Sequence, residues 1–149
     1  MRQWFKRPHK LTPISTGTQS LNLLSILCVA SLFGGMLLFA SGFGTLAFKL
    51  LDKATARSLI RDTFPYFYLY VLVNSGIAAA LSFFVNKSAF LLLILIFVTT
   101  IPNRQFLMPA INNAADTGNK KTWGMLHGLS VIITLTHIAL AGAALKYLL

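Results

Sequence analysis

The sequence predicts an all-α fold: a bundle of four transmembrane helices, with a short amphipathic interfacial helix between the first and second spans. Hydrophobic residues make up 56% of the 149-residue chain and charged residues only 11%, well below the charged share of soluble domains. The apolar residues fall into four runs of the roughly 20 residues that a helix needs to cross a bilayer. The formal charge of +10 therefore indicates contact with anionic lipid headgroups rather than with nucleic acid.

The N-terminal part divides into a tail and a first membrane span. Residues 1–20 are basic and are interrupted by prolines and a glycine, which predicts an N-terminal tail, and residues 21–149 then form the membrane domain. The apolar run over residues 21–48 is longer than the roughly 7–15 residues of a signal-peptide core, so we expect a retained helix. Within it Ser31, Gly35 and Gly42 fall near one stripe, where small side chains let another helix approach closely.

A cationic stripe follows the first span. Lys49, Lys53, Arg57 and Arg61 recur every four residues and share one face of a helix. This pattern is typical of an amphipathic helix that lies at the membrane interface, or of a helical extension of the first span. We interpret the stripe as a solvated face that contacts headgroups, with an anion-binding site as the alternative.

Three further spans are predicted over residues 64–84, 88–111 and 123–145. Pro102 lies inside the third span, where we expect it to kink the helix, and Arg104 then lies near a membrane face. Lysines and arginines are nearly balanced between the two sides, and the weight of the first helix favours an N-terminus inside. We expect a multi-pass protein of the bacterial inner membrane.

The fourth span carries polar residues on one face. His127, Ser130, Thr134 and His137 fall within about 80° of one another around a helix of roughly 3.6 residues per turn. Polar groups that face lipid cost free energy, so we expect this stripe to face the interior of the bundle. We interpret Ser130, Thr134 and His137 mainly as polar groups that hold helices together.

One end of the bundle gathers the strongest candidates for a site. The end of the third span and the start of the fourth lie on the same side of the membrane as the loop between the first two spans. The polar and aromatic residues near that side form a candidate polar site: Arg61, Tyr66, Asn103, Arg104, His127 and Ser130. We interpret them as helix-end caps and headgroup contacts, or as a site for an anionic headgroup, a small anion or a metal complex. Among them we single out His127.

Cofactor and catalytic chemistry have weak signals in this sequence. His127 and His137 are separated by roughly 15 Å along a helix, too far to ligate one iron, so haem would need another ligand. Soft donors are present at Cys28, Met36 and other methionines, but without the clustered spacing of a metal site. No aspartate falls inside a span to orient a catalytic histidine. We therefore expect no enzyme activity and no cofactor, with haem or a soft metal ion as alternatives.

Several pieces of the sequence occur in an order and spacing that resemble a known membrane family. They are SGF at residues 41–43 with Phe48 after it, FPYF at 64–67, NRQFLMPAIN at 103–112 and HGLS at 127–130. The chain resembles the domain of unknown function 4149 family, which includes the transmembrane protein 205-like proteins, over residues 21–145. It departs from the family's pattern at Ala115, where arginine is expected before Asp116.

The resemblance implies a four-helix integral membrane protein with no established reaction. Kinship in fold with copper-resistance and haem-pathway membrane proteins implies a link to soft metals or haem, without giving any residue a role. We expect a non-enzymatic protein in transport, metal tolerance or trafficking, or an accessory subunit. The alternative is a haem- or redox-linked protein that uses His127 or His137. Expected partners are anionic headgroups and either further copies of the chain or a larger membrane complex.

Overall fold

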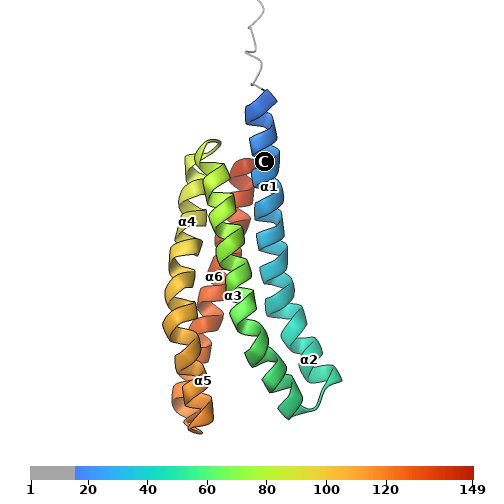
Figure 1. Ribbon diagram of the computed structural model, residues 1–149, viewed down its shortest axis with the longest axis vertical. Helices are drawn as coiled ribbons and strands as arrows, with labels where there is room; N and C mark the ends of the chain where they lie inside the picture. Colours follow the sequence, from blue (N-terminus) through green and yellow to red (C-terminus); the bar gives the residue numbers. More distant parts are fainter. Residues whose placement is uncertain (1–15) are drawn as a thin grey trace, which may run out of the picture.

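The chain passes four times between the two ends of the molecule (Figure 1). A computed structural model describes residues 16–149, and over that range the regular elements are all helices. The first pass comprises α1 (Thr16–Leu37), the π-helical η1 (Leu38–Phe43) and α2 (Gly44–Leu50), and the second is α3 (Lys53–Phe83). The third comprises α4 (Lys87–Pro102), the π-helical η2 (Asn103–Leu107) and α5 (Met108–Asp116), and the fourth is α6 (Lys120–Leu148).

Each pass is long and apolar enough to cross a membrane. The four segments are Gly17–Leu50, Lys53–Phe83, Lys87–Asp116 and Lys120–Leu148. At a rise of about 1.5 Å per residue, each of them exceeds the roughly 30 Å of the hydrocarbon core. The prediction of an all-α fold with four membrane spans is confirmed, and the chain is a multi-pass membrane protein.

Successive passes run antiparallel around a single core. α1 and α4 each pack against both α3 and α6, so the four passes form a closed ring of helix interfaces (Figure 1). All four passes supply the buried core: Val29, Leu32 and Met36 of α1, Phe67, Tyr68, Val71, Ala78 and Ala79 of α3, Ala89, Leu93 and Ile96 of α4, and Ala141, Ala144 and Leu148 of α6. Small residues let the helix backbones approach closely, which matters in lipid because there is no hydrophobic drive between helices.

Two asparagines bond to the C-terminal end of α6, which lies at the upper end of the bundle in Figure 1. The side-chain oxygen of Asn86 caps α4 by accepting from the backbone N–H groups of Ser88 and Ala89, at 2.9 and 3.1 Å. Its amide nitrogen donates to the carbonyl of Tyr147 at 2.9 Å, and that of Asn22 donates to the carbonyl of Leu148 at 3.4 Å. The last carbonyls of a helix have no partner within it, so these bonds satisfy the C-terminus of α6.

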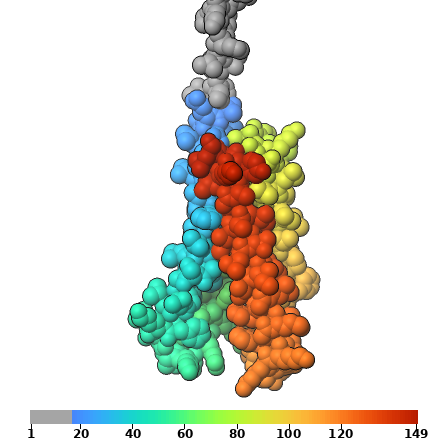
Figure 2. Space-filling model, turned by 180° about the vertical axis from the view of Figure 1, so that it is seen from behind, coloured from blue at the N-terminus to red at the C-terminus, as the bar shows by residue number. Residues whose placement is uncertain are grey.

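Toward the opposite end of the bundle, the hairpin of the first two passes separates from the hairpin of the last two. There α2 and the start of α3 form one lobe, and α5 with the start of α6 forms the other (Figures 1 and 2). Aromatic rings fill the first lobe where α3 meets η1. Phe39 stacks on Phe67 with ring centroids 4.0 Å apart and meets Phe64 edge-on at 5.4 Å. Such pairs stabilise a contact beyond the apolar area that they bury.

The first helix begins earlier than the sequence predicts. α1 starts at Thr16, so residues 16–20, which were expected in the basic tail, are helical, while residues 1–15 lie outside the described part of the chain. Gly17 did not stop the helix, because a glycine near a helix end costs only about 1 kcal/mol. α1 therefore begins five residues before the predicted start of the first span.

The predicted amphipathic helix is not a separate element. The chain breaks after Leu50, and Lys53, Arg57 and Arg61 belong to the first turns of α3, which continues through Pro65 to Phe83. Asp52 explains the position of the break, because its carboxylate accepts from the N–H groups of Ala54 and Thr55 at 3.0 and 3.1 Å as an N-cap. Hydrogen bonding to Thr55 lowers the pKa of Asp52. Three members of the cationic stripe thus extend the second span, whereas Lys49 lies in α2 at the end of the first span.

Gly35 brings α1 against Tyr70 of α3. The Tyr70 hydroxyl donates to the backbone carbonyl of Ser31 at 2.5 Å and lies 3.2 Å from the Ser31 hydroxyl. A Cβ atom built on Gly35 would lie only 2.6 Å from Cζ of the Tyr70 ring. Gly42 differs, since a Cβ there would approach only Leu38 of its own helix. Of the predicted packing residues, Ser31 and Gly35 contact another helix and Gly42 does not.

Gly35→Ala is expected to lower the melting temperature of the purified protein. The new methyl group displaces Tyr70 from its bond to Ser31, and overpacking of this kind costs roughly 1–3 kcal/mol. Gly34→Ala is the matched control, because nothing lies within 4 Å of a Cβ at that position and alanine favours the helix. Melting curves in detergent measure both variants, and equal melting temperatures would contradict the packing role of Gly35.

Candidate functional site

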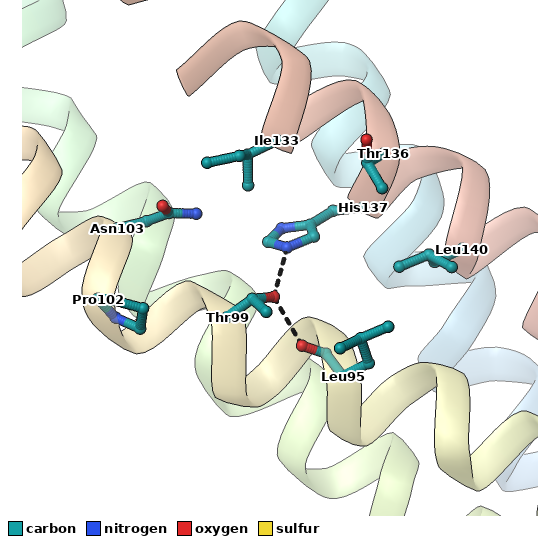
Figure 3. A pocket seen from close by; sticks show the side chains of 8 residues that line it. All are labelled: Leu95, Thr99, Pro102, Asn103, Ile133, Thr136, His137 and Leu140. Atoms are coloured by element: carbon teal, nitrogen blue, oxygen red, sulfur yellow. Dashed lines mark hydrogen bonds between the residues drawn. The ribbon is translucent and has the colours of Figure 1, made fainter. Parts of the chain in front are cut away.

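A pocket of about 330 Å³ lies between the third and fourth passes. It is formed where the end of α4 and the start of η2 face the middle of α6 (Figure 3). Its lining combines apolar walls with a few polar groups and no charged residue: Leu95, Thr99, Pro102, Asn103, Ile133, Thr136, His137 and Leu140. Ligand sites in proteins have this composition, with apolar walls and a small number of placed polar groups.

His137 is the polar centre of this pocket. Its side chain is only 6% exposed, and its Nε2 atom lies 2.8 Å from the Thr99 hydroxyl of α4. Thr99 in turn donates to the backbone carbonyl of Leu95 at 2.6 Å. Figure 3 shows the chain of hydrogen bonds from His137 through Thr99 to Leu95. The histidine is therefore held in one orientation by a neighbouring helix.

Asn103 faces His137 from the other side of the pocket. Its side chain points into the pocket toward the imidazole ring (Figure 3), and the residue is 6% exposed. Among the described residues, the side chain of Asn103 forms no hydrogen bond. Its amide atoms are not among the buried atoms that lack a partner, so they reach the open space of the pocket and can bond to a polar group of a ligand.

The π-helical segment η2 positions Asn103. Pro102 and Pro109 flank this segment and cannot donate backbone hydrogen bonds. Met108 donates to the carbonyl of Asn103, five residues earlier, which is the pattern of a π-helix. Because a π-turn takes more residues than an α-turn, it shifts the faces of η2 relative to α4. Segments of this kind occur often at functional sites.

Arg104 lies next to Asn103 but outside the pocket lining. Its Nε atom is buried and has no hydrogen-bond partner among the described residues. An arginine within a membrane span is costly unless it reaches water, headgroups or a partner.

His127 does not join this arrangement. Its side chain is exposed and stacks on Trp123 of the same helix, with ring centroids 4.9 Å apart and an interplanar angle of 8°. Ser130 is buried and its hydroxyl lies 3.3 Å from that of Tyr68 on α3. These two members of the candidate polar site thus serve different contacts. Ser130 joins helices, whereas His127 lies on the surface of α6.

Tyr66 and Arg61 also lie outside the His137 pocket. Tyr66 is 72% exposed and lines a second pocket with Gly35 and Phe39, between the first and second passes. Arg61 forms two bonds to the Asp116 carboxylate, at 2.6 and 2.8 Å. This ion pair joins the first lobe to the second at the end where the hairpins separate. Arg61 is therefore not simply part of a solvated cationic face, although Ala115 replaces the expected arginine beside Asp116.

Of the residues in the candidate polar site, only Asn103 lines the pocket with His137. The sequence did not single out Thr99, and it assigned His137 to helix packing. The antiparallel arrangement of the last two spans could have indicated that Thr99 and His137 lie close together. Thr99 lies twelve residues after the start of α4 at Lys87, and His137 lies eleven residues before the end of α6 at Leu148. Antiparallel neighbours of similar length bring such positions to the same depth.

A family model described as domain of unknown function (DUF4149) matches residues 27–120. This range ends at the first residue of α6, so it includes Thr99 and Asn103 but not His137. No curated protein and no solved structure matches the chain.

Asp116→Asn is expected to lower the melting temperature slightly at low ionic strength and less at high ionic strength. The variant removes the ion pair with Arg61, whose two side chains are 46% and 55% exposed, and exposed pairs are weak and screened by salt. Asp62→Asn is the matched control, because it removes an equal charge that also lies near Arg61. Within the described residues the Asp62 carboxylate accepts from Ser58, at 3.3 Å, and forms no bond to Arg61. Melting curves at low and high salt test this, and a salt-independent loss would contradict an electrostatic role.

Proposed function

Because the chain belongs to the DUF4149 family and is a multi-pass membrane protein, we propose a non-enzymatic function: binding of a membrane-soluble small molecule between α4 and α6. The observation that carries this proposal is the His137 pocket. It contains a buried imidazole and an unpaired amide at a depth where every polar group needs a partner. The pocket lies between two helices of a bundle, which is a common location for ligand sites.

The core of the bundle and the pocket point to binding rather than to conduction through the centre. Val29, Leu32, Leu93 and Ile96 are fully buried in the middle of the helix ring. The pocket instead lies at the α4–α6 interface, where Leu95 and Thr136 are exposed on the outside of the bundle. A molecule dissolved in the bilayer reaches such a pocket sideways, without crossing the core.

Within this proposal the protein acts in transport, metal tolerance or trafficking, or as an accessory subunit that presents the molecule to a larger membrane complex. We place it in the bacterial inner membrane with its N-terminus inside. Its cationic residues at the lobed end, such as Lys53, Arg57 and Lys120, suit contact with anionic headgroups. Self-association or a larger complex remains part of the proposal.

One observation favours the haem- or redox-linked alternative, and it concerns Nδ1 of the His137 ring. Nδ1 of His137 has no hydrogen bond to a described residue, so it is available as a single ligand. His127 does not supply the second ligand to the same iron, because it lies on the surface against Trp123. Among the described residues no cluster of three histidine, cysteine or acidic side chains is present. His137 is the histidine that lines the pocket, so among the described residues it is the one placed to ligate haem there.

Purification after expression with added haem tests this alternative. If it is correct, the protein shows a Soret band corresponding to about one haem per chain, and His137→Phe abolishes the band while His127→Phe keeps it. A colourless parent protein that inserts normally into the membrane would exclude the haem-linked function.

Photolabelling tests the proposed binding function. A lipophilic phenyldiazirine is expected to label the segments that line the pocket, and an excess of the same compound without its diazirine should compete. Thr136→Trp places a large side chain at the pocket and is expected to reduce this labelling several-fold. Leu135→Trp is the matched control, because Leu135 is 57% exposed and does not line the pocket.

Mass spectrometry of the labelled peptides gives the readout. Labelling that is spread evenly around the bundle and is not reduced by the competitor would show partition into lipid alone. That result would contradict binding in the pocket. Equal labelling of the two tryptophan variants would contradict it as well.

A further inference from the structure

The hydrogen bonds of Thr99 determine which nitrogen of His137 carries the proton. A threonine hydroxyl has one proton. The Thr99 oxygen lies 2.6 Å from the carbonyl oxygen of Leu95 and 3.3 Å from that of Ile96. A carbonyl cannot donate, so the hydroxyl proton must point toward these carbonyls. Thr99 therefore accepts at its 2.8 Å contact with His137, and Nε2 of His137 is the donor.

The other ring nitrogen then faces the pocket as an acceptor. In a neutral imidazole with a proton on Nε2, Nδ1 carries a lone pair. None of the residues that line the pocket is charged, and an uncompensated charge at this depth is costly, so the neutral form fits the surroundings. A ligand at Nδ1 must consequently donate a hydrogen bond and must itself be uncharged.

Asn103 adds a second condition on the ligand. Its amide carries both N–H donors and a carbonyl acceptor, and it points into the pocket toward His137 (Figure 3). A hydroxyl group satisfies both residues, because its proton goes to Nδ1 and its oxygen accepts from the amide. An ether or a ketone lacks the proton, and a carboxylate brings a charge that the lining does not balance.

The apolar lining of the pocket restricts the kind of molecule that carries the hydroxyl. Leu95, Pro102, Ile133 and Leu140 are apolar, and they suit a ring or a short alkyl chain. We propose that the pocket selects an uncharged lipophilic alcohol or phenol, with its hydroxyl bound between Nδ1 of His137 and the amide of Asn103. This inference rests on the proposed binding function and adds the chemical class of the ligand.

Nuclear magnetic resonance on the full chain tests the inference. The protein is labelled with ¹⁵N-histidine, placed in phosphatidylcholine nanodiscs and titrated with 4-hexylphenol or with its methyl ether, 4-hexylanisole. His137 is assigned by the signal that is lost in His137→Gln. We expect a protonated Nε2 and an unprotonated Nδ1, and a saturable shift of the Nδ1 signal with the phenol. The phenol should bind about tenfold more tightly than the ether, since it forms an additional buried hydrogen bond.

Variants then separate the two polar contacts. Asn103→Leu should remove most of the preference for the phenol while the His137 tautomer is kept. Asn113→Leu makes the same change at an exposed asparagine outside the pocket and should keep the preference. Thr99→Val removes the acceptor of Nε2–H and should change the His137 tautomer signals, whereas Thr99→Ser should restore them.

The possible outcomes are distinct. If the phenol and the ether bind equally, the pocket binds through its apolar walls, and the hydroxyl inference is wrong while the proposed binding function stands. A protonated Nδ1 in the parent protein would also overturn the inference. If neither compound shows saturable binding, both the inference and the proposed function fail for ligands of this size.

Discussion

The structure depends on one constraint: in hydrocarbon, each polar group needs a partner inside the protein. The helices satisfy their own backbone groups, and most hydroxyls of the spans also bond locally. Hydroxyls that donate to the carbonyl four residues earlier are those of Ser25, Ser41, Thr45, Thr63, Thr99, Thr100, Thr134 and Thr136. Because so many polar groups are satisfied within one helix, those that are not stand out. Neither Nδ1 of His137 nor the side-chain amide of Asn103 bonds to a described residue, and both residues line the same pocket. The described atoms that are fully buried without a partner are Asn22 Oδ1, Ser82 Oγ and Arg104 Nε.

The third pass shows how backbone chemistry shapes that pocket. Two prolines flank the π-helical segment that carries Asn103, and neither can donate to the helix. The backbone accommodates them by changing its hydrogen-bond pattern rather than by ending the span. As a result, Thr99 and Asn103 both face α6, although they lie on either side of Pro102. The same proline that interrupts the helix also lines the pocket.

The two ends of the bundle are held in different ways. At one end, Asn22 and Asn86 bond directly to the last carbonyls of α6. At the other end the hairpins separate, and the pair between Arg61 and Asp116 joins them across exposed surface. A surface pair contributes little and is screened by salt, whereas amide bonds to a helix terminus satisfy groups that otherwise lack partners. The lobed end is consequently the less firmly joined of the two.

The sequence by itself determined the fold class, because the length and composition of an apolar run decide whether a helix can span a bilayer. It also predicted the place of Ser31 and Gly35 in a helix contact, since small residues reveal close approach. Only the tertiary structure decided which histidine lines a pocket. His127 and His137 share one helix and nearly one face, yet His127 lies against Trp123 on the surface and His137 meets Thr99. That difference comes from the depth and rotation of α6 against α4, which depend on contacts between residues 38 positions apart and leave no periodic pattern in the sequence.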